Sequence, residues 1–226
     1  MKQKILQFLK SRQRILSLTL KLHSFIYFLF FFRNKGKGNK FNYPPCYFKN
    51  TVINVEGNNN LINFGSFSTF HNCKIIVVGN NNNITIGNKV RFNGARFWLD
   101  QNNNSITIGD RCTIRGNSLI GVIEGTQITI GEDCMFADNI DIRTGDSHSI
   151  INSIGVRINK SQNIKIGNHV WLAKNVTCLK GVTIADNCIV GANSLLTKNY
   201  EEPNTLILGS PAKIVKSKID WLRERI

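Results

Sequence analysis

Residues 166–198 read IGNHVWLAKNVTCLKGVTIADNCIVGANSLLTK, and their hydrophobic pattern repeats every six residues. The first phase of this repeat holds Ile166, Leu172, Cys178, Ile184 and Val190. A second phase, four residues further on, holds small or β-branched residues. An amphipathic helix would need a period of 3.6 residues, so the pattern predicts short strands joined by tight turns. Three hexads make one triangular coil, and stacked coils bury a continuous aliphatic column.

The same signature occurs earlier in the chain at a longer period. Ile-Asn-Phe-Gly at 62–65 is followed by Ile-Thr-Ile-Gly at 84–87, 106–109 and 128–131. This 22-residue period exceeds three hexads by four, and Asn-rich tetrads such as Asn80 to Asn83 fall at corresponding places. We interpret these tetrads as widened corners in turn conformations that stack as a ladder.

Most cysteines follow the same register. Cys112, Cys134 and Cys188 fall four residues after an isoleucine of the repeat, and Cys178 fills the aliphatic position itself. These positions predict small buried hydrophobic residues. No C-x-x-C or His/Cys spacing indicates zinc, so we expect no metal site.

The first 40 residues differ from the rest of the chain in charge. They hold ten Lys/Arg and no Asp or Glu, so residues 41–226 carry only +5 of the net +15. Because the charge is so uneven and no nucleic-acid-binding motif accompanies it, we expect no nucleic-acid partner. The apolar run Phe25 to Phe32 is much shorter than the ~20 residues of a spanning helix, and basic residues flank it. Residues 1–32 therefore predict an interfacial membrane anchor, with a packing helix and an uncleaved export signal as the alternatives.

These patterns divide the chain into three parts. Residues 1–40 are a basic, apolar helical segment that ends in a linker at 35–39. Residues 41–218 are an all-β repeat domain with a protruding loop at about 141–163. We expect residues 219–226 to form a short C-terminal helix.

The repeat domain resembles the hexapeptide-repeat acyltransferases, which are left-handed parallel β-helices. The resemblance covers residues from about 50 to 218, and residues 166–198 carry it together with GSPAKIVK at 209–216. Trp171 and the Gly-x-Pro-Ala-Lys motif are typical of the sugar and polysaccharide acetyltransferase branch. Ile219-Asp220-Trp221 is similar to the end of capsule and surface-polysaccharide O-acetyltransferases, including those for polysialic acid. The longer, Asn-rich coils depart from the family pattern.

One segment, residues 135–163, breaks the six-residue phase and is long enough for a protruding loop. Loops on rigid scaffolds often carry catalytic groups, and this one contains Asp141, Arg143, Asp146 and His148. A histidine has an ordinary pKa of ~6.5 and is therefore suited to take a hydroxyl proton, which makes His148 the candidate general base. The resemblance implies the same role, because the family's base is a loop histidine some two dozen residues before the hexad tryptophan, and His148 precedes Trp171 by 23.

Other residues are candidates for the acceptor side of the site. Asp146 would orient His148 or hold its imidazolium, with turn formation as the alternative. Trp171 would be a platform for a sugar ring or a wall for the pantetheine arm, with subunit packing as the alternative. Arg143 and Asp141 would contact the acceptor, Arg143 through an acidic sugar, with a plain surface charge as the alternative.

The resemblance also implies acetyl-CoA as co-substrate, bound between adjacent protomers of a homotrimer. Ala173 and Lys174 would line the thioester region, where a backbone N–H would stabilise the oxyanion. Family contacts to pantetheine and phosphate match Ala192, Thr197 and Lys198, and basic residues of the terminal motif match Lys213 and Lys216. Packing at Ala192 and solvated charges at Lys213 and Lys216 are the alternatives.

The predicted function is transfer of acetyl from acetyl-CoA to a hydroxyl of a bacterial surface polysaccharide, with a sialic-acid-containing capsule as one acceptor. The N-terminal segment would hold the enzyme on the cytoplasmic face of the membrane. N-acetylation of a nucleotide-linked amino sugar and O-acetylation of a simple sugar use the same scaffold. A non-catalytic structural β-helix is the alternative from another class.

Overall fold

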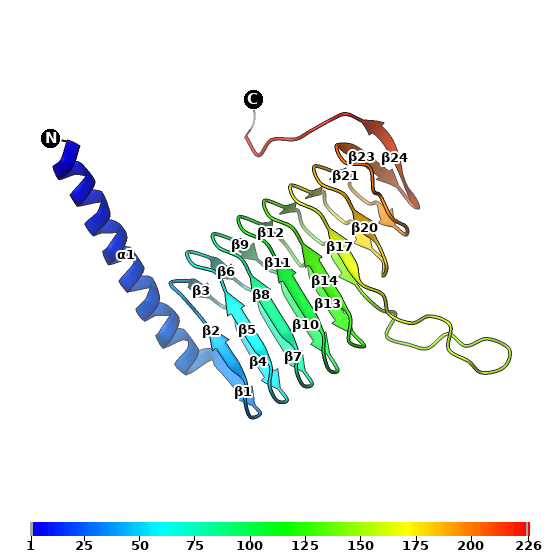
Figure 1. The fold of residues 1–226 in the computed structure, drawn as a ribbon, viewed down its shortest axis with the longest axis horizontal. Helices are drawn as coiled ribbons and strands as arrows, with labels where there is room; N and C mark the ends of the chain where they lie inside the picture. Colours follow the sequence, from blue (N-terminus) through cyan, green and yellow to red (C-terminus); the bar gives the residue numbers. More distant parts are fainter. Residues whose placement is uncertain (1, 225) are drawn as a thin grey trace.

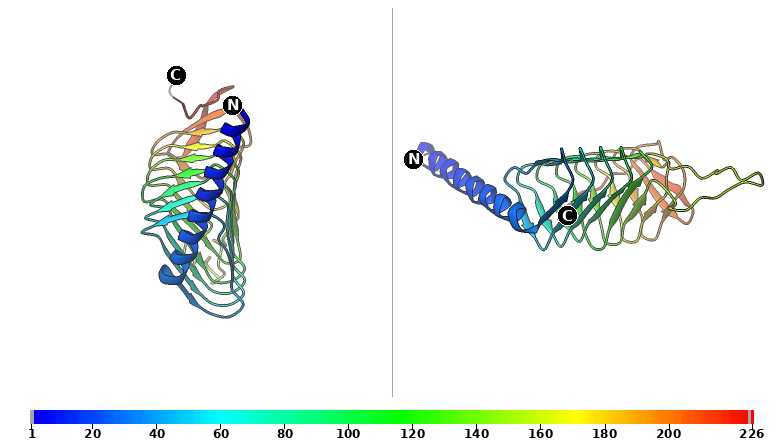
Figure 2. Two further views of the ribbon diagram at one scale, coloured as in Figure 1. Left: turned by 90° about the vertical axis from the view of Figure 1, so that its left-hand side faces the viewer. Right: turned by 90° about the horizontal axis from the view of Figure 1, so that it is seen from below.

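The chain forms one long helix followed by a parallel β-solenoid (Figure 1). The computed structural model describes residues 2–224 and 226, with side chains described from residue 12 onward except at 225. After α1 (Lys2–Phe31), each turn of the chain contributes one strand to each of three sheets, which makes a three-sided prism (Figure 2). One of these sheets takes eight strands, one from each of about eight turns. This architecture confirms the all-β repeat fold predicted from the six-residue period.

We call the three faces sheets A, B and C. Sheet A contains, in spatial order, β1 (Phe32–Lys35), β4 (Val52–Glu56), β7 (Lys74–Val78), β10 (Arg96–Asp100), β13 (Leu119–Ile123), β16 (Asp141–Arg143), β19 (Thr177–Cys178) and β22 (Leu195–Leu196). Sheet B contains β2 (Lys40–Asn42), β5 (Leu61–Phe64), β8 (Asn83–Ile86), β11 (Ser105–Ile108), β14 (Gln127–Ile130), β17 (Ile164–Ile166) and β20 (Thr183–Ile184). Sheet C contains β3 (Tyr47–Lys49), β6 (Thr69–His71), β9 (Arg91–Asn93), β12 (Thr113–Ile114), β15 (Met135–Phe136), β18 (Trp171–Leu172), β21 (Ile189–Val190), β23 (Thr205–Gly209) and β24 (Ala212–Ser217).

Identical residues stack on one another inside the prism. Ile84, Ile106 and Ile128 stand opposite one another on successive strands of sheet B, and all three are fully buried. All six cysteines are buried and unpaired, which confirms the role as small core residues predicted for Cys112, Cys134, Cys178 and Cys188. Burial raises the pKa of Cys46 to about 12, so this thiol stays protonated at neutral pH.

The Asn-rich corners lie between sheets A and B and form the predicted ladder. The side-chain oxygen of Asn60 accepts from the backbone N–H of Asn82 at 2.8 Å, and that of Asn82 accepts from Asn104 at 2.9 Å. These three side chains are buried, and the residues directly before them, Asn59, Asn81 and Asn103, have positive φ. A short amide side chain tolerates this conformation and bonds the next turn, which explains the composition of the corner.

The last third of α1 closes the N-terminal end of the solenoid. Ser24 Oγ donates to the carbonyl of Cys46 at 2.8 Å, and Tyr27 Oη accepts from the N–H of Thr51 at 2.7 Å. Phe28 packs edge-on against Phe48, a fully buried aromatic residue of the first turn. One face of the helix therefore satisfies backbone groups of the first turn and covers its core.

The solenoid begins earlier than the sequence indicated. Residues 35–39 are not a linker, because Phe32–Lys35 already forms β1 and pairs with β4 of the next turn. Gly36 lies so close to that turn that a Cβ atom there would stand 1.8 Å from the carbonyl oxygen of Gly57. The glycines of this stretch therefore form a tight corner of the first coil.

The expected C-terminal helix is wrong for the described residues 219–224. After the antiparallel pair β23 and β24, this segment runs back along the corner between sheets B and C as an extended strap (Figure 1). The Trp221 ring stacks on His169 at 4.1 Å, and Arg223 donates to the carbonyl oxygens of Asp133 and Cys134. So short a helix is marginal on its own, whereas the strap buries an indole and bonds several turns.

Candidate active site

The break in the repeat forms a hairpin that projects from the corner between sheets A and B (Figure 1). This hairpin, residues 144–163, takes the place that the Asn tetrads occupy in earlier turns. Its two arms meet at Ile151 and Arg157, and the N–H of Ile158 donates to the carbonyl of Ile150 at 2.8 Å. His148 lies on the outgoing arm with an exposed side chain. The predicted loop and its histidine therefore stand outside the prism wall.

A buried amide side chain holds the backbone at and just after His148, and also the side chain of Asp146 before it. Asn159 is the only buried residue within 145–163, all of which the structure describes. Its Nδ2 donates to the carbonyl of His148 and to the Asp146 carboxylate, both at 2.8 Å. Its Oδ1 accepts from the N–H of Ile150 at 2.7 Å and from the Arg157 side chain at 3.1 Å. The segment that carries His148 is thus tied to the returning arm.

Asp146 does not contact the imidazole. Its carboxylate bonds to Lys180 Nζ and to Asn159, and among the described residues nothing bonds the His148 ring. The hydrogen bond from Lys180 lowers the pKa of Asp146 below its ordinary value, against the opposing effect of burial. Asp146 is therefore ionised at neutral pH and acts on the hairpin backbone, which corrects its predicted contact with His148.

A groove of about 440 Å³ lies at the base of the hairpin. This hairpin groove is lined by Asp141, Arg143 and Asp146, together with Ser147 and Lys180. Asp141 and Arg143 are two residues apart on one strand, so they share its outer face and form a bidentate ion pair with both contacts at 2.7 Å. The groove therefore brings together three of the predicted site residues, Asp141, Arg143 and Asp146. Its lining also includes Ser147, which directly precedes His148 in the sequence.

The other described histidines are engaged elsewhere. Both ring nitrogens of His169 are bonded, Nδ1 to Asp133 at 2.7 Å and Nε2 to the carbonyl of Trp221 at 3.0 Å. His23 Nε2 lies 2.9 Å from the carbonyl of Phe48 at the helix cap. His71 lies in sheet C, with its ring 5.4 Å from that of Tyr47. His148 is the histidine that directly follows a lining residue of the hairpin groove, Ser147.

The residues predicted for acetyl-CoA lie at another corner of the prism, where sheet C passes into sheet A. Trp171 is half-buried, 6.0 Å from the ring of Trp221. The N–H of Ala173 donates to the carbonyl of Val190 at 2.9 Å and is not free for an oxyanion. Among the described backbone groups, the N–H of Lys174 donates no such bond. Of the two residues predicted to line the thioester region, Lys174 is therefore the one with a backbone N–H left for an oxyanion.

The remaining predicted cofactor residues follow in the later turns. Ala192, Thr197 and Lys198 are exposed, as are Lys213 and Lys216 on β24. In the described part of the chain no carboxylate pairs with any of these three lysines or with Lys174. Unpaired ammonium groups of this kind suit the phosphates of acetyl-CoA. None of these residues, nor Trp171, lines the hairpin groove.

Comparison with solved structures extends the likeness across nearly the whole chain. A crystallographically analysed polysialic acid O-acetyltransferase, OatWY, matches with a TM-score of 0.84 and 38% identity, covering 86% of this chain and 92% of that one. The chain belongs to the hexapeptide-repeat acyltransferases. The family model for the bacterial transferase hexapeptide (six repeats) matches residues 163–198. A second structure of this family, the polySia-specific acetyltransferase NeuO, matches with a TM-score of 0.56 and 25% identity, covering 85% of this acyltransferase and 88% of that chain.

Curated relatives of this acyltransferase match over shorter stretches. The polysialic acid O-acetyltransferase of Neisseria meningitidis is 40% identical over 91 residues, which are 40% of this chain and 42% of the relative. The galactoside O-acetyltransferase of Escherichia coli K12 is 42% identical over 53 residues, 24% of this chain and 26% of the relative. The chain thus aligns with less than half the length of these curated relatives.

Several residues of the acyltransferase site were not found from the sequence. Asn159 lies in the segment that breaks the repeat, so the period gives it no register. Lys180 lies in the regular repeat, but its partner Asp146 lies in the hairpin, so the period does not predict their contact. Lys74 and Arg96 line a second groove, which shares Asp141 and Arg143 with the hairpin groove. Their proximity to each other could have been predicted from the sequence. The 22-residue period of the early coils separates them in sequence and places them opposite each other.

Proposed function

We propose that this protein transfers an acetyl group from acetyl-CoA to a hydroxyl of an acidic bacterial surface polysaccharide. The observation that carries the proposal is the 38% identity over 92% of a polysialic acid O-acetyltransferase structure. The site supports it, because the one hairpin that leaves the solenoid in the described residues carries His148 next to Ser147, and Ser147 lines the hairpin groove together with a cation, Arg143. Arg143 uses Nε and Nη2 on Asp141, so its Nη1 is the donor that would bind a sugar carboxylate.

In the proposed reaction, acetyl-CoA supplies the acetyl thioester, and Lys174, Lys198, Lys213 and Lys216 supply positive charge for its phosphates. His148 takes the proton of the acceptor hydroxyl as that oxygen attacks the acetyl carbonyl. The backbone N–H of Lys174 donates to the carbonyl oxygen as it gains negative charge. The tetrahedral intermediate then breaks its C–S bond, CoA leaves as the thiolate, and the His148 imidazolium returns its proton to that sulfur. Transfer is direct, with no covalent intermediate on the protein.

The proposed catalytic unit is a homotrimer in which each site draws on two protomers. Within one chain, His148 and Trp171 lie at different corners of the prism, on either side of sheet A. The hairpin also exposes aliphatic side chains, among them Ile151 and Ile154, which are 60% and 80% exposed. An arm with this surface is suited to packing on a neighbouring protomer.

We propose membrane-surface binding at the cytoplasmic face for α1. Residues 12–31 are long and apolar enough to cross a membrane by length and composition. However, Ser24, Tyr27 and Phe28 are held by the first turn of the solenoid, while Leu22, Leu29 and Phe30 on the helix are exposed. A helix docked on one side and apolar on the other is suited to lie in the lipid interface. Lys21 and Arg33 flank this surface, where anionic headgroups would attract them.

The test of the proposed activity is the His148→Ala variant. We expect acetyl transfer to polysialic acid to fall by about 10²–10⁴-fold, because general-base catalysis is lost, while the melting temperature stays unchanged. Acetyl-CoA consumption is measured with polysialic acid, a nucleotide-linked amino sugar and a free sugar as acceptors. Turnover with the amino sugar alone would indicate N-acetylation. No acetyl-CoA binding at all would indicate a structural β-helix and contradict the proposal.

A further inference from the structure

Two cations stand next to each other on sheet A without a counter-ion. Lys74 and Arg96 begin β7 and β10 and lie directly opposite each other in register. Both side chains are exposed, and no described acidic residue forms an ion pair with either. Like charges at directly opposed positions destabilise a sheet. The pair therefore has no explanation in the packing of the chain itself.

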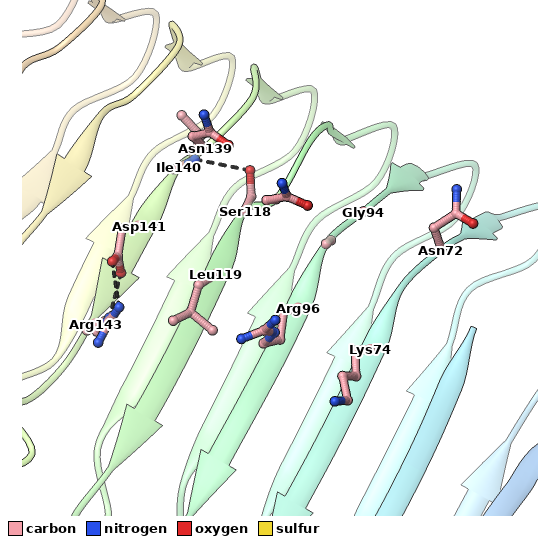
Figure 3. Close-up of a pocket in the computed structure, with 12 residues that line it drawn as sticks. Asn72, Lys74, Gly94, Arg96, Ser118, Leu119, Asn139, Ile140, Asp141 and Arg143 are labelled. Carbon is pink, nitrogen blue, oxygen red and sulfur yellow. Dashed lines mark hydrogen bonds and ion pairs between the residues drawn. The ribbon is translucent and has the colours of Figure 1, made fainter. Parts of the chain in front are cut away.

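The pair lines a groove that runs along sheet A toward the hairpin (Figure 3). This sheet A groove encloses about 440 Å³, and Asp141 and Arg143 at its far end also line the hairpin groove. Leu119 lies between, in register with both Arg96 and Asp141. Neighbouring strands are ~4.8 Å apart, so the three steps from β7 to β16 extend roughly 14 Å. A ligand that spans the groove is an extended molecule.

The adjacent row of the same sheet offers an aromatic surface. Trp98 stands opposite Gly121, and Gly121 stands opposite Arg143. Because Gly121 has no side chain, the indole of Trp98 borders a shallow depression that continues past Arg143 to Ser147. Aromatic surface beside a few well-placed charges is typical of a binding cleft. This row connects the sheet A groove with the residue next to His148.

We propose that Lys74 and Arg96 form a remote acceptor subsite, which binds carboxylates of an acidic polysaccharide on units beyond the one that reacts. The inference rests on the proposed function and assigns selectivity for a polymer over a single sugar. Ammonium and guanidinium groups bind carboxylates by charge-assisted hydrogen bonds. One exposed ion pair contributes little binding energy. Selectivity for the polymer therefore arises because Lys74 and Arg96 both bind a polysaccharide chain that Arg143 also binds.

The first experiment removes both charges and compares two acceptors. The double variant Lys74→Gln with Arg96→Gln is assayed at low salt with polysialic acid and with free sialic acid. We expect KM for the polymer to rise about tenfold with kcat within about twofold, and no change for the monomer. The matched control, Lys89→Gln with Arg91→Gln, removes the same charge from the sheet C side. An equal rise in KM for this control would overturn the subsite.

The second experiment measures binding without catalysis. The full-length His148→Ala protein is passed over immobilised polysialic acid, alone and with each double substitution, and eluted with salt. Retention lost only on substitution of Lys74 and Arg96 supports the subsite. Equal retention of all three proteins, or none by the parent, overturns it, whether or not acetyl transfer has been found. The melting temperature of the subsite variant should not fall, because a like-charge pair has been removed.

Discussion

Asn159 shows how a single side chain sets the position of a catalytic candidate. It bonds the carbonyl of His148 and the N–H of Ile150, and it also bonds the Asp146 carboxylate, which Lys180 holds from the next turn of the prism. The Asn159 amide is buried, and both of its N–H groups and its oxygen have hydrogen-bond partners. Burying this polar group therefore costs little free energy. Asp146 thus influences His148 through Asn159, as a positioning residue.

The Asn159→Ala variant tests this positioning role. We expect kcat for acetyl transfer to fall about tenfold to a hundredfold, because the imidazole is no longer held at the reacting hydroxyl, with KM for acetyl-CoA unchanged. Asn152→Ala is the matched control, since among the described residues the Asn152 side chain bonds only the N–H groups of Ile154 and Val156 at the hairpin tip. Equal losses in the two variants would show that general loosening of the hairpin, and not this bond set, is responsible.

Sequence reasoning reached the residues of the site unevenly. The 22-residue period contains enough information to place Lys74 beside Arg96, because every early coil has the same length. The partners of Asn159 follow from no period, since the hairpin interrupts the repeat and its bonds depend on tertiary geometry. The direct contact predicted between Asp146 and the His148 ring does not form, for the same reason: closeness to His148 in sequence does not specify which way a loop carboxylate turns.

At the scale of elements, α1 has two distinct faces. One face, with Ser24 and Tyr27, is fixed to the first turn of the solenoid, and the other exposes Phe25 at 49% and Phe30 at 75%. The two interpretations of this segment, as an anchor or as a packing helix, are therefore not exclusive. Hydropathy alone could not separate them, because the faces differ in what they contact and not in composition.

Replacing Phe25 and Phe30 by Ser tests the exposed face. We expect the variant to leave vesicles that contain anionic lipid, as measured by co-sedimentation, because apolar area buried in the interface supplies most of the binding. Its melting temperature should be unchanged, since neither side chain packs on the solenoid. Ile151→Ser with Ile154→Ser is the control that removes similar exposed apolar surface from the hairpin. Unchanged partitioning of the Phe25/Phe30 variant would exclude this face as the membrane contact.

The strands were predicted better than the ends of the chain. The six-residue period specifies strands because each turn repeats the same inward positions, and Ile166, Leu172 and Val190 are all buried as expected. The strap was missed because its anchor is distant: Trp221 Nε1 donates to the carbonyl of His169, 52 residues away, at 2.8 Å. A local pattern at residues 219–226 contains no information about that partner.

At the scale of the whole molecule, one protomer does not bring the two halves of the proposed site together. His148 projects from the corner between sheets A and B, and the Trp171 to Lys174 segment lies at the far edge of sheet A. Cyclic symmetry places one corner of a protomer against a different corner of its neighbour. The proposed trimer would therefore complete each site from two chains.

Mixing two inactive chains tests this arrangement. His148→Ala and Trp171→Ala variants are co-expressed with different tags, and the mixed assemblies are purified through both tags. If each site takes His148 from one protomer and Trp171 from the next, every mixed trimer has one intact site, so about a third of the parent activity returns. Mixed trimers without activity above that of either variant would place both residues in the same protomer.

The covers at the two ends of the prism affect the self-association of the protein. A parallel solenoid has unpaired strand edges at its first and last turns, and such edges are templates for head-to-tail growth into fibres. Here α1 occupies the first edge through Ser24 and Tyr27, and the antiparallel strand β24 covers the last strand of sheet C. Loss of either cover would turn a particle of fixed size into the repeating unit of a filament.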